Sequence, residues 1–145
     1  MALDQAALFM NLREMLIRHE GLVYKPYNDT VGKLTVGVGR NLDDVGISHD
    51  EIMLMLDNDI ETATHNCEFY PWFSKLSDTR KAACIDLIFN LGANKFRGFV
   101  KFIAAMGAGN YDVAAAELVA SKWYLQVGKR GPELVEMIRH EVWPQ

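Results

Sequence analysis

Three side chains that could share one hydrolytic reaction lie close together near the start of the 145-residue chain. Glu20 is followed by Asp29 and Thr35 within the segment RHEGLVYKPYNDTVGKLTVGVGRNL. Two carboxylic acids on opposite sides of a glycosidic bond can cleave it, because one protonates the departing oxygen while the other activates or positions water. This pattern indicates a glycoside hydrolase.

A turn of the chain has to bring the two acids together. In one continuous helix, at about 100° per residue, Glu20 and Asp29 would lie on opposite faces. Gly21 favours a helix end directly after Glu20, and Pro26 excludes helix beyond it. The β-favouring residues and turn formers that follow predict a β-hairpin over residues 24–39, with Asp29 in or beside its loop.

The helix before the hairpin predicts the surroundings of Glu20. Leucines recur at every fourth residue from Leu8 to Leu16, and Glu20 continues this apolar stripe. Loss of solvation raises the pKa of a carboxylic acid, so we expect Glu20 to keep a proton near neutral pH and to act as a general acid. Asp29 lies in a polar loop, where we expect it to stay ionised.

Several sequence blocks carry a resemblance to a known family. They are HEG at residues 19–21, YxDTxGxxTxGxG at residues 27–39, SKWY at residues 121–124, Arg130 and Trp143. In this order they resemble the phage-type lysozymes of glycoside hydrolase family 24, over about residues 9–143, which is nearly the whole chain.

The resemblance implies a reaction and a role for four residues. The protein would be an inverting muramidase that hydrolyses the β-1,4 bond between N-acetylmuramic acid and N-acetylglucosamine, for lysis of a host cell. Glu20 would be the general acid, while Asp29 and Thr35 would hold the attacking water. Arg130 matches the arginine that pairs with the catalytic glutamate, so it would orient Glu20. Such a partner lowers the pKa of Glu20 and desolvation raises it, and the sequence leaves open which effect is larger.

The resemblance also implies contacts to the glycan. Phe89 and Asn90 match a Phe-Gln pair on the cleft floor of the family, with asparagine in place of glutamine. For Phe89, a purely structural place in the core is an equal alternative. Lys122 stands where an arginine is found in the family, so it keeps the charge but loses the fork of donors. It could meet an acidic peptide stem.

The same resemblance implies the fold class, which is α+β and mostly α. We expect a lysozyme-like fold in which a small N-terminal lobe with a β-hairpin is joined by a long helix to a helical C-terminal lobe. One domain would cover residues 1–145, with the first lobe at about 13–60. The second lobe would comprise about 68–145 together with the N-terminal helix.

Capping signals divide the rest of the chain into helices. Ser48 and Glu51 form a capping box that opens a helix to about residue 67. Ser77 could cap the next helix, which Gly92 ends. Cys84 lies in this apolar helix and is expected to be a buried thiol. Further helices are predicted over residues 96–106, 112–126 and 132–142.

Composition excludes several other classes of protein. The net charge is −4, and no basic stripe with interleaved aromatic residues indicates nucleic-acid binding. The sequence contains no run of eighteen apolar residues, so it predicts no membrane span. The N-terminal segment, with an early Asp4, lacks the pattern of a signal peptide. We therefore expect the protein to stay in the host cytoplasm until a separate pore releases it to the cell wall. The scattered histidines and two cysteines suggest no metal site and no disulfide framework, and we expect a monomer without a cofactor.

Two other functions fit parts of this pattern. A lytic transglycosylase can work with a single glutamate, so the presence of Asp29 and Thr35 favours a reaction that uses water. A non-catalytic glycan-binding module, such as a structural part of a virion, would tolerate loss of Glu20 or Asp29, and both are present. Hydrolysis of peptidoglycan is the preferred interpretation.

Overall fold

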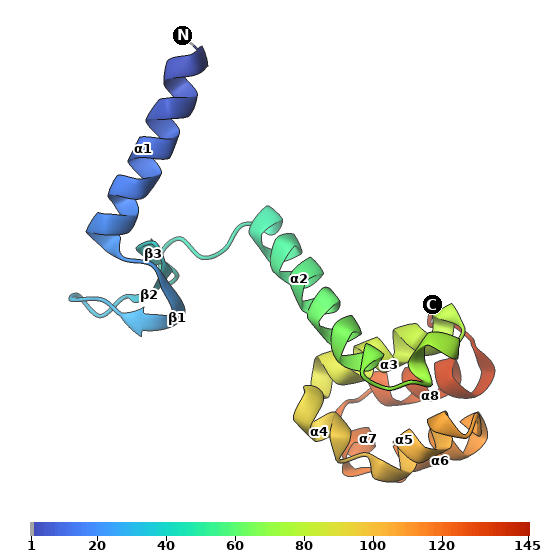
Figure 1. Ribbon diagram of the computed structural model, residues 1–145. Coiled ribbons are helices and arrows are strands. Elements are labelled where there is room, and N and C mark those ends of the chain that lie inside the picture. Colours follow the sequence, from blue (N-terminus) through green and yellow to red (C-terminus); the bar gives the residue numbers. More distant parts are fainter. Residues whose placement is uncertain (1) are drawn as a thin grey trace. The chain divides into compact units, whose positions relative to one another are not determined.

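The computed structural model describes the backbone of residues 2–145 and the side chains of residues 4–145 (Figure 1). The predicted fold class is confirmed, because the chain is mostly helical with one small antiparallel sheet. By their internal contacts the residues form two units, Met1–Met53 and Leu54–Gln145, called unit 1 and unit 2 below. The prediction of one domain with two lobes stays a prediction.

Unit 1 begins with a helix that leads directly into the sheet. Its elements are α1 (Ala2–Glu20), β1 (Val23–Asn28), β2 (Leu34–Gly37) and β3 (Arg40–Asn41), and the strands pair in the order β1-β2-β3. The helix ends where the sequence predicts, because Gly21 has a φ of +79° and its N–H donates to the carbonyl of Ile17 at 2.8 Å. The predicted hairpin is confirmed, and the two-residue strand β3 adds a second, shorter hairpin to it.

A bulge in β1 sets the register of the sheet. Tyr27 pairs with Thr35 and Val23 pairs with Gly37, so β1 contains two more residues than β2 between these pairs. Pro26 lies in the longer stretch, where its lack of an N–H removes a ladder hydrogen bond. With this register Thr35 lies opposite Tyr27, near the end of β1 and next to the loop that contains Asp29.

The predicted capping box opens α2 (His49–Glu68). The N–H of Ser48 donates to Glu51 Oε1 at 2.9 Å, and the N–H of Glu51 donates to Ser48 Oγ at 3.2 Å. Two backbone donors that helix geometry leaves without partners are thus satisfied reciprocally. The prediction from the sequence is confirmed.

Unit 2 consists of the rest of α2 and of short helices. They are the 3₁₀ helix η1 (Phe73–Lys75), α3 (Asp78–Leu91), α4 (Ala93–Arg97), α5 (Val100–Gly107), α6 (Tyr111–Val119), α7 (Lys122–Gln126) and α8 (Arg130–His140). Ser77 caps α3 as predicted, since its Oγ accepts the N–H of Arg80 at 3.3 Å, and Gly92 ends this helix. Helix α8 packs against α3, α6 and α7.

Two of the predicted helices are each broken in two. The helix predicted at 96–106 is interrupted at Gly98 and Phe99, between α4 and α5. The helix predicted at 112–126 is interrupted before Ser121, whose Oγ accepts the N–H of Tyr124 at 3.2 Å and donates to the carbonyl of Leu118 at 2.6 Å. The apolar periodicity runs through both breaks, whereas the backbone follows the local hydrogen bonds. The prediction of continuous helices was wrong here.

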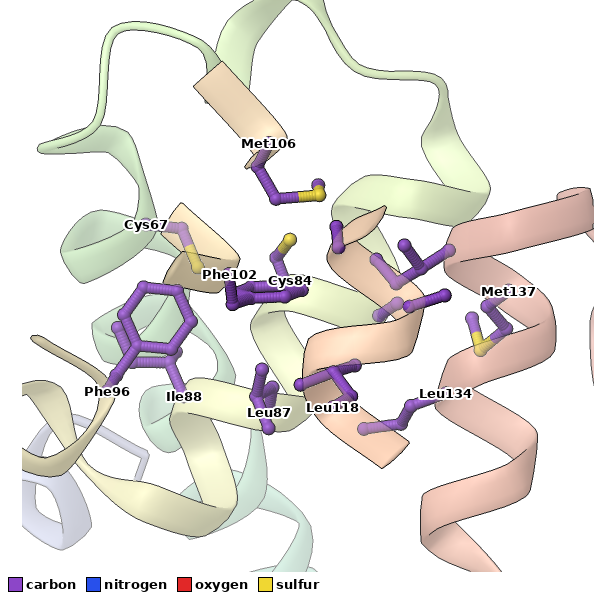
Figure 2. Close-up of a cluster of buried hydrophobic side chains, with 14 of the residues drawn as sticks. Cys67, Cys84, Leu87, Ile88, Phe96, Phe102, Met106, Leu118, Leu134 and Met137 are labelled. Carbon is purple, nitrogen blue, oxygen red and sulfur yellow. The ribbon is translucent and has the colours of Figure 1, made fainter. Parts of the chain in front are cut away.

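The hydrophobic core lies in unit 2 (Figure 2). Its fully buried large side chains are Phe96, Phe102, Leu87, Met106, Leu118, Ile138, Cys67 and Cys84. The ring of Phe96 lies edge-to-face with two others, its centroid 5.3 Å from that of Tyr70 and 6.1 Å from that of Phe102. Among residues 4–53, Thr35 alone is buried. The packing that stabilises the fold is therefore concentrated in unit 2.

Both cysteines are free thiols inside this core (Figure 2). Burial raises the pKa of Cys67 to about 12, with a smaller contribution from the charge of Glu68. Burial likewise raises the pKa of Cys84 well above its ordinary value. The prediction that Cys84 is a buried thiol is confirmed, and both thiols stay protonated at neutral pH.

Arg80 holds the C-terminal end of α8. Its Nε donates to the carbonyl of Ile138 at 2.7 Å, and Nη2 donates to that of Arg139 at 3.2 Å. The guanidinium also lies 3.7 Å from the ring centroid of Tyr111 and 3.4 Å from Glu141. A cation at this position satisfies carbonyls that have no partner within the helix and opposes the negative end of the helix dipole.

Candidate active site

Glu20 lies at the end of α1, against the turn between β2 and β3. A Cβ atom built on Gly39, in that turn, would be only 2.6 Å from Glu20 Oε2. The carboxyl group of Glu20 thus occupies the space beside the Gly39 backbone. Glu20 is exposed within its own unit. The loss of solvation that we expected from the apolar stripe of α1 is therefore not provided by unit 1.

Asp29 begins the loop between β1 and β2 and organises it. Its Oδ1 accepts the N–H of Val31 at 3.0 Å and the N–H of Lys33 at 2.8 Å. Its own N–H donates to the carbonyl of Lys33 at 2.9 Å, and its carbonyl accepts the N–H of Gly32 at 3.0 Å. One carboxylate oxygen is thereby held in place by the backbone, as in other turns closed by an aspartate. The side chain is half-buried.

Thr35 lies on β2 with its side chain almost fully enclosed. It is 4% exposed, and its Oγ1 donates to the carbonyl of Lys33 at 2.9 Å. A carbonyl can only accept a hydrogen bond, so the hydroxyl proton of Thr35 is committed to Lys33. The hydroxyl oxygen therefore presents its lone pairs, and it can accept a hydrogen bond from another molecule.

These three predicted residues belong to the same unit and are positioned by consecutive elements. The helix end supplies Glu20, the β1–β2 loop supplies Asp29, and β2 supplies Thr35. Lys33 links the last two, because its N–H donates to Asp29 and its carbonyl accepts from Thr35. The three side chains supply two carboxylic acids and a hydroxyl, and two carboxylic acids are what hydrolysis of a glycosidic bond usually requires.

Arg130 lies in unit 2, where it pairs with Asp86. Its Nε is 3.0 Å from Asp86 Oδ1. This is an ion pair rather than an aligned hydrogen bond, since Oδ1 is buried and has no hydrogen-bond partner of good geometry among the described residues. Burial raises the pKa of Asp86, the charge of Arg130 opposes that shift, and Glu133 adds to it. The sequence did not point to Asp86, and the pairing of Arg130 with Glu20 stays a prediction.

Phe89 borders a cavity of about 350 Å³ next to this ion pair. The cavity is lined mostly by apolar side chains: Leu56, Ile60, Ala82, Ile85, Asp86, Phe89 and Arg130. Phe89 is 43% exposed within unit 2, and its contact with the glycan stays a prediction. An exposed aromatic ring beside a cation is a surface on which a sugar ring can pack.

Asn90 is held by Trp123, a residue of the SKWY block. Trp123 is buried, and its Nε1 donates to Asn90 Oδ1 at 2.9 Å. Because the amide oxygen faces the indole, the amide NH₂ group points away from it and can donate to a ligand. The neighbouring Lys122 is exposed. The SKWY block thus contains one candidate contact residue, Lys122, and its Trp123 holds a second, Asn90.

Residues 17–141 match the family model for phage lysozyme. The chain belongs to the phage lysozyme family. It is 32% identical over 136 residues to a SAR-endolysin of Escherichia phage Mu, which covers 90% of this chain and 74% of that protein. It is 25% identical over 158 residues to probable T4-type lysozyme 1 of Dictyostelium discoideum, covering 88% of this chain and 93% of that protein.

Membership of the phage lysozyme family confirms the resemblance drawn from the sequence blocks. It makes the chain a peptidoglycan-cleaving glycosidase. The matched region contains every candidate residue from Glu20 to Arg130. The candidate catalytic residues lie near its start, and the candidate glycan contacts lie in its second half.

In this phage lysozyme an ion pair between Arg40 and Glu51 lies next to Gly39, the residue against which the Glu20 carboxyl group lies. Arg40 directly follows Gly39, and its Nη1 donates to Glu51 Oε1 at 2.9 Å and to the carbonyl of Gly46 at 3.2 Å. The hydrogen bond from Arg40, with further ones from Ser48, lowers the pKa of Glu51 to about 2. The pair connects β3 to the first turn of α2, a contact that was not predicted from the sequence.

Replacing Glu51 by glutamine should destabilise this phage lysozyme in a pH-dependent way. The pKa of Glu51 falls from an ordinary 4.5 to about 2 in the folded protein. A depressed pKa contributes stability above pH 4.5 that disappears as the pH falls toward 2. We therefore expect the melting temperature of Glu51→Gln to lie below wild type at pH 7 and to converge with it between pH 5 and pH 2. Thermal melts across this range measure the difference.

A second glutamate of α2 serves as the control for this variant. Glu61 is exposed and forms no ion pair within residues 4–145. Glu61→Gln should therefore change the melting temperature by little at any pH. A difference between Glu51→Gln and wild type that persists unchanged at pH 2 would contradict the role of the ionised carboxylate.

Proposed function

We propose that this phage lysozyme is an inverting muramidase that hydrolyses the β-1,4 bond between N-acetylmuramic acid and N-acetylglucosamine in peptidoglycan. The observation that carries this proposal is that Glu20, Asp29 and Thr35 all belong to unit 1 and that Lys33 orients the Thr35 hydroxyl. Family membership supports the substrate, and the side chains support the reaction.

Glu20 is the general acid of the proposed reaction. Its protonated carboxyl group donates to the glycosidic oxygen as the bond from that oxygen to the anomeric carbon breaks. The departing sugar leaves as an alcohol, and Glu20 is left as a carboxylate. The position of the carboxyl group beside the backbone of Gly39 limits where it can deliver the proton.

Asp29 and Thr35 hold the water that attacks the anomeric carbon. The Thr35 oxygen accepts one hydrogen bond from this water, because the hydroxyl proton is committed to Lys33. Asp29 accepts the second proton as the water oxygen forms its bond to carbon. Attack from the face opposite to the departing oxygen inverts the configuration, so a β bond gives an α product.

Side chains of unit 2 bind the glycan in this proposal. Phe89 packs against a sugar ring, the Asn90 amide donates to a sugar or peptide carbonyl, and Lys122 pairs with an acidic peptide stem. Arg130 orients Glu20. A guanidinium carries five N–H donors, so the ion pair between Arg130 and Asp86 leaves donors for a second carboxylate.

Hydrolysis is favoured over a lytic transglycosylase reaction by Thr35. A transglycosylase closes an internal anhydro ring and needs no attacking water. Such a reaction has no role for the Thr35 hydroxyl, which is buried and whose oxygen is left as a hydrogen-bond acceptor. A non-catalytic binding module has no need for the full set of acid, carboxylate and hydroxyl. Both alternatives remain outcomes of the experiment below.

Digestion of purified peptidoglycan in ¹⁸O-labelled water tests the proposal. We expect fragments with reducing N-acetylmuramic acid ends that carry one ¹⁸O atom by mass spectrometry, and an initial α anomer by NMR. Anhydro-muramic ends would assign the protein to the transglycosylases. Reducing ends at N-acetylglucosamine would show cleavage of the other glycosidic bond. The absence of products from several wall types would favour a binding module.

We further propose that the cleavage serves lysis of a bacterial host, with the protein acting as a monomer. SAR-endolysins of Escherichia phage Mu and of bacteriophage PS119 are among the relatives. No helix in residues 2–145 has the length and apolar character needed to cross a membrane.

A further inference from the structure

The turn between β2 and β3 comes unusually close to the end of α1. Gly39 lies in this turn with a φ of +68°. A Cβ atom on it would be 2.6 Å from Oε2 of Glu20, 3.0 Å from Cδ and 3.1 Å from Cγ. Such distances are shorter than van der Waals contact, so the carboxyl group of Glu20 fills the space that any side chain at this position would need.

Comparison with Gly37 separates two reasons for a glycine at position 39, which are the backbone conformation and the space beside the residue. Gly37 has a φ of +69°, nearly the value of Gly39, but a Cβ atom on Gly37 would meet nothing within 4 Å. Backbone conformation alone therefore accounts for glycine at position 37. At position 39 the positive φ favours glycine, and in addition the carboxyl group of Glu20 occupies the space of a side chain.

We propose that Gly39 is a positioning residue for Glu20, because the missing side chain at this turn determines where the carboxyl group of the acid lies. The proposal rests on the function proposed for Glu20. The atoms that a new Cβ would meet are the flexible end of a glutamate, which can rotate away. A substitution at Gly39 would therefore displace the acid while the rest of unit 1 keeps its fold.

The matched pair Gly39→Ala and Gly37→Ala tests this positioning. Both variants place alanine at nearly the same positive φ, so we expect their melting temperatures to fall by similar amounts. We expect kcat on peptidoglycan to fall about 10- to 100-fold for Gly39→Ala, with KM within about threefold of wild type, because misplacing a reacting group by about 1 Å can cost 100-fold. Gly37→Ala should stay within about threefold of wild type in both constants.

A spectroscopic measurement reports the contact without relying on activity. In protein with ¹³C-labelled glutamate, the Cδ resonance of Glu20 can be assigned by its absence from Glu20→Gln. We expect this resonance to move in Gly39→Ala and to coincide with wild type in Gly37→Ala. If wild type does not cleave any wall, the function proposed above fails, and the resonance still decides whether Gly39 positions Glu20.

Asparagine at the two positions covers the case in which an alanine variant does not fold. Asparagine tolerates positive φ better than alanine but has the same Cβ atom. Gly39→Asn should therefore reproduce the loss of kcat and the moved resonance, while Gly37→Asn should not. Equal losses at positions 37 and 39, or wild-type kcat with an unmoved Glu20 resonance at position 39, would overturn the proposal.

Discussion

Glu20→Gln is expected to reduce the rate of peptidoglycan cleavage at least 100-fold, which is the lower end of the effect of a general acid. Glutamine has the shape of glutamate but cannot donate a carboxylic proton to the departing oxygen. The melting temperature should stay at or slightly above that of wild type, because polar groups in active sites often reduce stability. Release of soluble fragments and a thermal melt of the same preparation measure both quantities.

Glu14 offers a matched control on the same helix. It is exposed, and it makes no ion pair among residues 4–145. Glu14→Gln removes the same charge from α1, so an effect of net charge on binding to the wall would appear in both variants. If Glu20→Gln keeps more than about a tenth of the wild-type rate, the assignment of the acid is wrong.

Phe96→Ala should produce the largest loss of stability among the variants considered. Phe96 is fully buried at the centre of the aromatic cluster with Tyr70 and Phe102. Removing a buried phenylalanine ring costs about 3–5 kcal/mol, since the transfer free energy is lost and a cavity remains. For a chain of this size we expect a fall in melting temperature of about 10 °C. Urea unfolding gives the free energy directly.

Phe69 provides the control for this prediction. It is also edge-to-face with Tyr70, at 5.4 Å between ring centroids, but it is 78% exposed. Phe69→Ala should cost less than about 1 kcal/mol, the size of an aromatic pair at the surface. Comparable losses for the two variants would mean that the contact with Tyr70, and not burial of Phe96, stabilises the cluster.

Local sequence signals were sufficient to predict the elements that carry the candidate catalytic residues. Gly21 predicted the end of α1, and the turn formers around Asp29 predicted the loop of the hairpin. Ser48 and Glu51 predicted the start of α2. In each case the residues that form the hydrogen bonds are within four positions of one another, so the sequence alone contains the full interaction.

Contacts between distant segments were not predicted. Asp86 faces Arg130 and Trp123 donates to Asn90 only because α3, α7 and α8 pack together. The contact of Gly39 with Glu20 likewise joins the end of α1 to the turn between β2 and β3. The breaks at Phe99 and Ser121 were missed because apolar periodicity reports which side of a helix is buried and does not report where the helix stops.

The boundary between the two units separates the proposed chemistry from the proposed recognition of the wall. Glu20, Asp29 and Thr35 precede it, whereas Phe89, Asn90 and Lys122 follow it. Exchanging unit 2 for that of a related lysozyme should therefore change wall preference and leave the reaction unchanged. Because the boundary falls inside α2, such an exchange has to be made within a helix, and the junction has to keep the hydrogen bonds from each N–H to the carbonyl four residues earlier.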